Sequence, residues 1–353
     1  MADRREQQLQ ALGTEAARFR QLIGKVGSGT HTSTGLSRAE AAEAMALMLG
    51  GRLPPAQLGA FLIAHRIRRP APLELAGMLD ALRAEGPALH TPGRRALCFG
   101  VPYDGRSRTA PLLPLLALTL AAAGQPVVLH GGGPMPVKYG VTLAELFGAL
   151  GIDWPALSLE QLQRQLDRHQ LALSHQPRHL PAAEPLVQIR DLIGKRPPLA
   201  TLELLWTPHR GAHLQVCGFV HPPTETLALE ALQLAGERDV LLLKGQEGST
   251  DLPLNRAGIA TRLSGEQQQR LELQPRDHGL EGSEVAWGGL ESWREQAMAG
   301  LGGQGPLAGA LVWNLGVLLW QSGAGGDLPA AIGQARALLA AGAGEGLRRQ
   351  LAG

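Results

Sequence analysis

The chain has 353 residues, of which 44% are hydrophobic and 18% are charged, and its formal net charge is +2. These values describe a soluble globular protein with a large buried core, built as two compact units or as one unit with an appended piece. No apolar run is long enough to cross a bilayer, and the N-terminal segment MADRREQQLQ is too polar for a secretory signal. We therefore expect a cytoplasmic protein without a membrane partner.

The first predicted unit, residues 1–90, is entirely helical. After a polar leader, one helix is predicted over 15–24, and a second follows the capping box SRAE at 37–40. A third helix opens at the two prolines 54–55, and a fourth runs over about 72–84. Such a unit is larger than its own core needs and offers a natural dimerisation surface.

The second predicted unit, residues 91–353, alternates strands with helices. This alternation predicts an α/β fold with a central, mostly parallel sheet, whose ligand loops collect at the carboxyl ends of the strands. The predicted strands are 96–99, 127–129, 171–174, 213–220 and 240–244. One predicted helix ends at 123, and three others span 158–169, 181–194 and 223–235. The chain is predicted to be helical again after 288.

Glycine-containing loops follow three of these strands, at 100–105, 131–133 and 245–251. Glycine lets the backbone approach a phosphate closely, and a helix N-terminus behind such a loop favours negative charge. Any one of these loops has a purely steric turn as its alternative explanation. Three loops in the same topological position together predict one shared cleft, and an anion is the expected ligand.

Neither the cysteines nor the histidines have a pattern typical of a metal site. Cys98 and Cys217 each lie in an apolar, strand-like run with no second cysteine at a ligand spacing, so we expect buried thiols. The pair His209 and His213 has the i, i+4 spacing of zinc ligands, as does the pair at 175 and 179. Both pairs are interrupted by a glycine or proline and lack an evident third ligand, so we do not expect zinc.

The loop sequences resemble those of the anthranilate phosphoribosyltransferase family. Enzymes of that family carry GTGGDG, then an Asn-Ile-Ser-Thr run, then Lys-His-Gly-Asn-Arg-Ser and finally an Asp-Glu pair. The corresponding segments here read GVPYDG at 100–105, LHGGGP at 129–134 and Thr250-Asp251. The resemblance covers nearly the whole chain. It implies a helical N-terminal domain, an α/β domain of the nucleoside phosphorylase/phosphoribosyltransferase type, and a site for phosphoribosyl diphosphate with magnesium.

The departures from the family motifs argue against transfer to anthranilate, and no cofactor is expected. Pro102 removes a backbone N–H donor and Tyr103 adds bulk to the first loop. Loss of a carboxylate weakens the oxygen shell that magnesium needs. The alternative is a glycosyl or phosphoribosyl transferase that uses phosphoribosyl diphosphate and magnesium on another acceptor. Its catalytic candidates are Asp104, His130 and Glu247, and its metal candidates are Asp104, Glu247 and Asp251.

Other departures add positive charge around the same loops, nearly all of it as arginine, which grips phosphate with a planar fork. Arg190 matches an arginine that contacts the aromatic acid in the enzymes. The pattern resembles the YbiB-type branch of the family, which implies a homodimer that binds nucleic acid, single strands especially, without tryptophan-pathway activity. The predicted phosphate-binding and nucleic-acid-binding residues are Gly100, Tyr103, Gly105, Arg106, Arg108, Gly131, Lys138, Arg178, Arg190, Lys195, Arg196 and Lys244.

Overall fold

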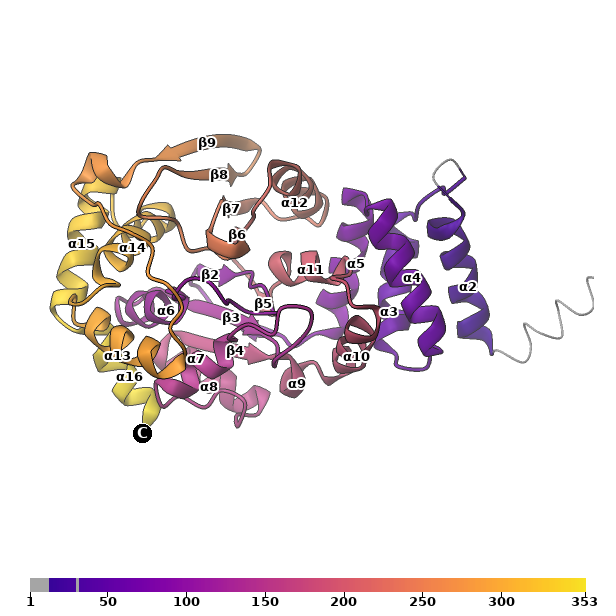
Figure 1. The fold of residues 1–353 in the computed structure, drawn as a ribbon, viewed down its shortest axis with the longest axis horizontal. Coiled ribbons are helices and arrows are strands. Elements are labelled where there is room, and N and C mark those ends of the chain that lie inside the picture. Colours follow the sequence, from indigo (N-terminus) through magenta and orange to yellow (C-terminus); the bar gives the residue numbers. More distant parts are fainter. Residues whose placement is uncertain (1–12, 30–31) are drawn as a thin grey trace, which may run out of the picture.

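The structure is a computed structural model that describes residues 13–29 and 32–353; the polar leader at 1–12 lies outside the described residues. Ser37 caps a helix through the predicted capping box: its hydroxyl accepts the Glu40 N–H, and the Glu40 carboxylate accepts the Ser37 N–H. In Figure 1 the N-terminal helices stand together at one end of the elongated molecule. They are α2 (Thr14–Gly27), α3 (Arg38–Leu49), α4 (Pro55–Arg68) and α5 (Pro72–Glu85).

In the part of the chain that the structure describes, a seven-stranded sheet has the order β4-β3-β2-β6-β7-β8-β9. The strands from β4 to β7 are parallel, and β8 and β9 form an antiparallel hairpin at one edge. The strands of the seven-stranded sheet are β2 (Ala96–Phe99), β3 (Val127–Gly131), β4 (Leu171–His175), β6 (His213–Gly218), β7 (Asp239–Leu243), β8 (Gly258–Ser264) and β9 (Gln267–Leu273). The predicted helical N-terminal unit and mostly parallel α/β sheet are confirmed.

The sequence analysis did not find the β8–β9 hairpin, nor the short parallel pair β1 (Leu89–His90) and β5 (His209–Arg210). Strand β9 begins with three glutamines and an arginine that are all exposed, so neither of its faces is marked by apolar residues there. An edge strand with solvent on both faces lacks the alternation on which strand prediction depends. Among the described residues, no helix is both long and apolar enough to span a membrane.

Helices cover both faces of the sheet, and the C-terminal ones lie at the end of the molecule far from α2 to α5 (Figure 1). Helix α6 is buried on nearly all sides because it packs against α14 and α16 as well as the sheet. The remaining elements are α6 (Leu113–Ala122), α7 (Leu143–Ala149), α8 (Leu159–His169), α9 (Gln176–His179), η1 (Pro181–Ala183), α10 (Glu184–Ile193), α11 (Leu199–Leu205), α12 (Pro222–Leu234), η2 (Gln246–Gly248), η3 (Pro275–His278), α13 (Leu290–Leu301), α14 (Ala308–Ser322), α15 (Leu328–Ala340) and α16 (Ala343–Ala352).

The N-terminal helices share a hydrophobic core with part of the α/β unit. One apolar cluster joins side chains of α2 to α5 with those of α10, α11, α12 and one face of the sheet. Another fills the opposite face, under α6, α7, α8 and the C-terminal helices. Part of the apolar helical surface that the sequence analysis assigned to dimerisation is therefore covered within the chain. Cys98 and Cys217 are buried thiols, as predicted.

Glu74 is the polar centre of the helical part. Its carboxylate is 1% exposed and accepts N–H groups of Leu36 and Ala71 at 2.7 Å, and the Arg68 guanidinium. Burial alone would raise the pKa of Glu74, but His65, Arg68 and the backbone donors outweigh burial and lower the pKa to about 2. One charged side chain thus joins the loop before α3, the end of α4 and the start of α5.

We expect Glu74→Gln to lower the free energy of unfolding at neutral pH by about 3 kcal/mol, because the lowered pKa makes the ionised carboxylate stabilising. The folded pKa lies below the unfolded value of 4.5, so this stability is present above about pH 5 and is lost as the pH falls toward 2. Denaturant unfolding across that pH range measures the free energy of unfolding. Glu85→Gln is the control, because Glu85 is an exposed residue of the same helix. Parallel pH curves for wild type and Glu74→Gln would contradict the assignment.

Candidate functional site

The loops after β2, β3 and β7 meet at the carboxyl edge of the sheet. The first two are joined by an isolated β-bridge between Arg106 and Val141. The third is joined to the first by contacts of Arg106 with Glu247 and Asp251. Helix α11 packs against the first loop, since the Val101 N–H donates to the Glu203 carbonyl at 3.1 Å. The glycine loops that the sequence analysis singled out therefore form one structure.

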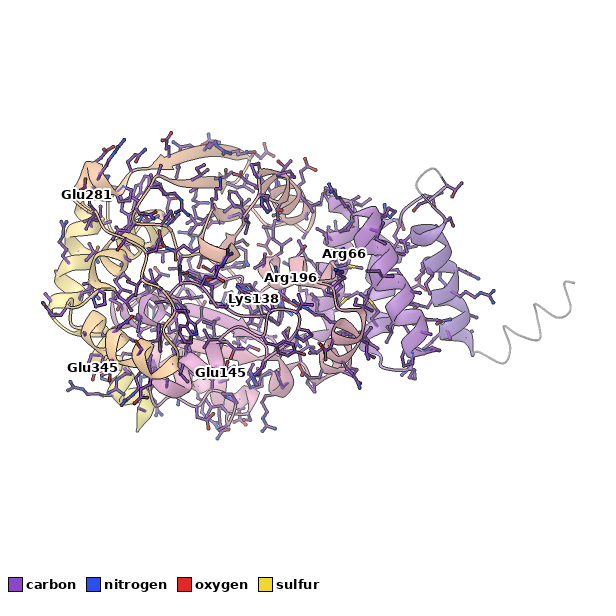
Figure 2. The ribbon with its side chains drawn as sticks, viewed as in Figure 1. Arg66, Lys138, Glu145, Arg196, Glu281 and Glu345 are labelled. Atoms are coloured by element: carbon purple, nitrogen blue, oxygen red, sulfur yellow. The ribbon has the colours of Figure 1, made fainter. Side chains whose placement is uncertain are left out.

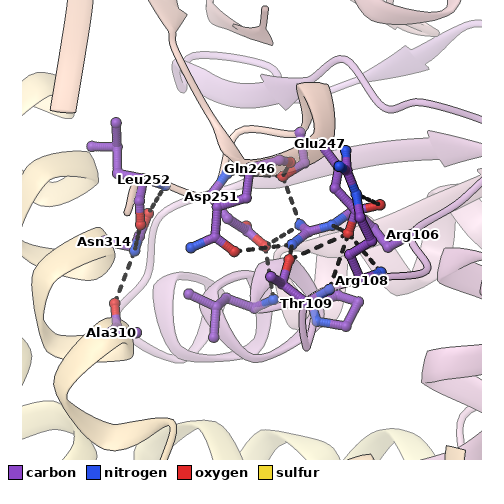
Figure 3. Close-up of polar contacts among 12 residues, drawn as sticks. Arg106, Arg108, Thr109, Gln246, Glu247, Asp251, Leu252, Ala310 and Asn314 are labelled. Atoms are coloured by element: carbon purple, nitrogen blue, oxygen red, sulfur yellow. Dashed lines mark hydrogen bonds and ion pairs between the residues drawn. The ribbon is translucent and has the colours of Figure 1, made fainter. Parts of the chain in front are cut away.

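The guanidinium of Arg106 lies at the centre of these loops (Figure 3). The Arg106 side chain is 5% exposed, and its Nη1 lies 2.7 Å from Asp251 Oδ2 and 2.7 Å from Ser249 Oγ. Its Nε lies 3.2 Å from Glu247 Oε1, and its Nη2 donates to Thr109 and Gln246. A buried charge requires partners of opposite sign and hydrogen bonds for its remaining protons, and Arg106 has both.

Glu247 fastens the first loop to the third. Its carboxylate accepts the backbone N–H groups of 107, 108 and 109 at 3.0 to 3.2 Å, and Lys138 Nζ lies 2.5 Å away. Its backbone is in the left-handed region, with φ 54°, a strained conformation for glutamate. Burial would raise the pKa of Glu247, but Lys138, the backbone donors and Arg106 hold it far below its usual range. The residue is therefore an ionised anchor.

Asp251 is held by Arg106 and by the Leu112 N–H at 3.0 Å. The chain after it is fixed by Asn314 of α14, whose amide accepts the Leu252 N–H at 2.7 Å and donates to the Leu252 and Ala310 carbonyls (Figure 3). A backbone held on both sides leaves Asp251 in one position. The C-terminal helices, which carried no expected chemistry, thus support this cluster.

Asp104 is also paired with arginine. Its Oδ2 lies 2.5 Å from Arg196 and 3.7 Å from Nη2 of Arg190, whose Nη1 lies 2.6 Å from Glu203 Oε1. Burial raises the pKa of Glu203 to about 7, against the opposing effect of Arg190. Arg190 lines a largely apolar cavity of about 50 Å³ between α10, α11 and the helical part. A cavity that takes up benzene is about 150 Å³, so this one is too small for an aromatic ring.

Gly100 and Gly105 have steric roles that the sequence analysis did not assign to them. A Cβ at Gly100 would lie 1.8 Å from the Leu204 carbonyl oxygen, and one at Gly105 would lie 2.4 Å from Gly140. The close approach at each glycine is thus made by this chain's own backbone. A Cβ at Gly131, in contrast, would make only ordinary van der Waals contacts, and Gly131 is buried at the end of β3. The two glycines of the first loop are therefore explained by steric fit within the chain, the alternative to anion binding.

Tyr103 and His130 form a buried pair. Trp206 Nε1 donates to the Tyr103 hydroxyl at 3.0 Å, and that hydroxyl lies 2.6 Å from His130 Nδ1. Because the indole can only donate, the Tyr103 proton is directed to His130. Burial lowers the pKa of His130 to about 3, so the imidazole is neutral and holds the first loop in place. The sequence analysis did not single out Trp206 and therefore missed this contact.

The structure divides the predicted phosphate-binding side chains into an inner and an outer group. Tyr103, Arg106 and Arg190 are 2 to 5% exposed and belong to the interior, which corrects their placement on a common binding surface. Their side chains turn inward because the carboxylates and rings that bind them lie there. The outer group is Arg108 and Arg196, with side chains 78% and 49% exposed, together with the exposed Arg178, Lys195 and Lys244.

A row of cations leads from this edge toward the helical part, and Figure 2 labels three of its members, Lys138, Arg196 and Arg66. Lys138 Nζ donates to the Gly105 carbonyl at 2.9 Å, and the neighbouring Asp104 binds Arg196. Arg66 Nε in turn donates to the Arg196 carbonyl at 2.8 Å. The sequence analysis did not single out Arg66, because it lies on α4, far in sequence from the glycine loops.

This architecture is that of a known family. The model of a glycosyl transferase family, helical bundle domain, matches residues 20–86, and that of the same family's a/b domain matches 111–345. The chain belongs to this glycosyl transferase family. The anthranilate phosphoribosyltransferase of Thermus thermophilus matches with a TM-score of 0.80 at 25% identity, over 95% of this chain and 98% of that one.

Of two relatives that are similar in sequence, one is named as an enzyme and the other is not. YbiB of Escherichia coli (strain K12), an uncharacterized protein, is 32% identical over 232 residues, which are 65% of this chain and 71% of YbiB. An anthranilate phosphoribosyltransferase of Verminephrobacter eiseniae (strain EF01-2) is 27% identical over 305 residues, 85% of this chain and 88% of that one. The family resemblance inferred from the loop motifs is therefore confirmed.

The residues at the carboxyl edge do not fit a magnesium diphosphate, the group that the family resemblance implies. Within the described residues, Asp104, Glu247 and Asp251 do not gather as metal ligands, and each is bound by arginine. The Arg106 guanidinium lies between Glu247 and Asp251, where a metal ion shared by these two carboxylates would have to lie. The backbone of Leu204 occupies the space beside Gly100.

We expect Arg106→Ala to lower the free energy of unfolding by about 3–5 kcal/mol, because it leaves Asp251 and Glu247 buried without their shared cation. Mg²⁺ should restore part of this loss in the variant, since the freed carboxylates attract a divalent cation, and should not affect the wild type. Thermal unfolding with and without Mg²⁺ measures both effects. Arg108→Ala is the matched control, because Arg108 pairs with the same Glu247 at 3.7 Å from an exposed position. Equal effects of the two substitutions would contradict the central role of Arg106.

Proposed function

We propose that this chain binds the phosphate backbone of nucleic acid, single strands especially, through the outer cations at the carboxyl edge. The observation that carries the proposal is the division of charge: Arg106 and Lys138 neutralise the inner carboxylates Glu247 and Asp251, while Arg66, Arg108 and Arg196 remain exposed. A row of exposed guanidinium groups can replace the counterions of a polyanion at successive phosphates. Lys195, which precedes Arg196 in the chain, is exposed as well.

Such a surface supports binding with little sequence preference. Contacts to phosphate position a nucleic acid but do not distinguish bases. Tyr103 is buried and takes no part in base stacking. Tyr139, beside Lys138, is 57% exposed, and its hydroxyl donates to Asp191 at 2.8 Å, so its ring is the aromatic face that this surface offers to an unpaired base. One exposed ring favours mainly electrostatic, salt-sensitive binding.

A fluorescence anisotropy titration with a single-stranded oligonucleotide at rising salt tests the proposal directly. Calorimetry with phosphoribosyl diphosphate and Mg²⁺ tests the alternative, a transferase acting on another acceptor. We expect salt-sensitive oligonucleotide binding. Tight diphosphate binding without oligonucleotide binding would overturn the proposal in favour of the transferase.

The double variant Arg66→Ala with Arg108→Ala should weaken oligonucleotide binding about tenfold at low salt and evenly across sequences, because it removes two phosphate contacts. The slope of log affinity against log salt should become shallower by about 1.4. Arg276→Ala with Arg349→Ala is the matched control, since these side chains are 69% and 72% exposed but lie in η3 and α16. If the two pairs change affinity and slope equally, the exposed arginines at the carboxyl edge are not the binding surface.

We also propose that the protein is a homodimer. Ile67 of α4 and Leu192 of α10 are 72% and 76% exposed, and these two helices pack against each other. Exposed aliphatic side chains on adjoining helices provide apolar surface that a second copy can cover. Ile67→Glu is expected to shift the mass measured by light scattering from dimer to monomer, whereas Leu234→Glu, 42% exposed on α12, should not. A monomeric wild type would refute the proposal.

A further inference from the structure

A second group of chemically reactive side chains lies away from the carboxyl edge. Cys98 Sγ and one ring nitrogen each of His209 and His213 all lie within 4.8 Å of one another. It is the one such group of potential metal ligands in the described parts of the chain, 13–29 and 32–353. Cys98 comes from β2 and His213 from the start of β6, its parallel neighbour in the sheet. The third ligand that the histidine spacing lacked is thus supplied by a different strand.

The hydrogen bonds of His209 leave its Nδ1 lone pair available. Its Nε2 lies 2.8 Å from Thr91 Oγ1, and that hydroxyl donates its own proton to the Arg94 carbonyl at 3.0 Å. The hydroxyl therefore accepts from His209, which places the ring proton on Nε2. Nδ1 is buried and has no hydrogen-bond partner among the described residues. A hydrogen-bonded N–H on the far side of the ring is the arrangement that orients a histidine ligand of a metal.

His213 is arranged in the same way. Its Nδ1 lies 2.8 Å from the Gly211 carbonyl, which can only accept, so Nδ1 carries a proton. Its Nε2 is buried and forms no hydrogen bond in the part of the chain described here, although Glu237 Oε2 lies 3.1 Å away. His213 Nε2 thus has the Glu237 carboxylate as a neighbour, whereas His209 Nδ1 has none within the described chain. Buried nitrogens are rarely left without partners, so the unpartnered His209 Nδ1, in a group with a thiol and a second imidazole, marks a place where a ligand atom is missing.

We propose that Cys98, His209 and His213 bind a zinc ion. One thiolate and two imidazoles are ligands that suit zinc, and three protein ligands leave one position of its tetrahedral shell for a further small ligand. Cys98 is fully buried, His209 is 2% exposed and the His213 side chain is 9% exposed, which indicates a site shielded from solvent. On binding, the thiol proton passes to the buffer and a sulfur–zinc bond forms. The zinc ion would tie β2 to β5 and to the start of β6.

Cobalt(II) provides a spectroscopic test on the full chain after chelator treatment. One cobalt ion per chain is expected, with a thiolate-to-cobalt charge-transfer band in the near ultraviolet and the visible bands of tetrahedral cobalt. Zinc should displace the cobalt. Cys98→Ser should abolish the charge-transfer band, whereas Cys217→Ser should keep it, because Cys217 is an equally buried thiol outside the cluster. A wild type without the band, or a band that persists in Cys98→Ser, would overturn the proposal.

A measurement on the unaltered protein covers the case in which Cys98→Ser fails to fold. Zinc should raise the melting temperature of the chelator-treated wild type, and Mg²⁺ should not, because a ligand that binds only the folded state stabilises it. His209→Gln should weaken zinc binding at least tenfold while leaving the Cys98 thiol in place. The competing possibility is a protonated His213 paired with Glu237. It predicts no zinc-dependent shift, and that result would also overturn the proposal.

Discussion

The carboxyl edge of the sheet depends on one buried guanidinium. Arg106 is 5% exposed and lies between Glu247 and Asp251, whose side chains are 4% and 1% exposed. None of these charges could remain in the interior alone, because an unpaired buried ion costs several kcal/mol. The loops after β2 and β7 are therefore fixed relative to each other by charge compensation. Lys138 brings the loop after β3 into the same arrangement through Glu247 and the Gly105 carbonyl.

This internal cation changes what the family fold can do at that edge. Glu247 and Asp251 have their negative charge satisfied by cations of the chain itself, Arg106 and Lys138. The fixed charge that remains at the carboxyl edge therefore belongs to the arginines outside this cluster. Arg108 binds Glu247 and Arg196 binds Asp104, and both arginines keep much of their surface in solvent. The edge thereby presents donors for an external anion instead of oxygens for an external metal.

Local sequence patterns predicted the elements well and the directions of side chains poorly. Strand β2 begins and ends at the predicted residues, and the capping box at Ser37 forms, because alternation, burial and capping are encoded within a few residues. The carboxylate partners of Arg106 lie more than 130 residues along the chain, so no local pattern distinguishes it from the exposed Arg108. The same limit hid Trp206 beside Tyr103, and Cys98 beside His209 and His213.

Strand β2 links the two ends of this architecture. Its Cys98 lies among the imidazoles, and only two residues later the Gly100 N–H bonds to the Val216 carbonyl of β6 at 2.8 Å, where the first loop begins. A metal ion on Cys98 and His213 would therefore hold the same pair of strands whose carboxyl ends set the position of Asp104 and Arg106. Packing around Gly100 leaves the backbone no room to shift against Leu204. The inner cluster is therefore fixed by this chain's own contacts, and the proposed phosphate contacts come only from the exposed arginines outside it.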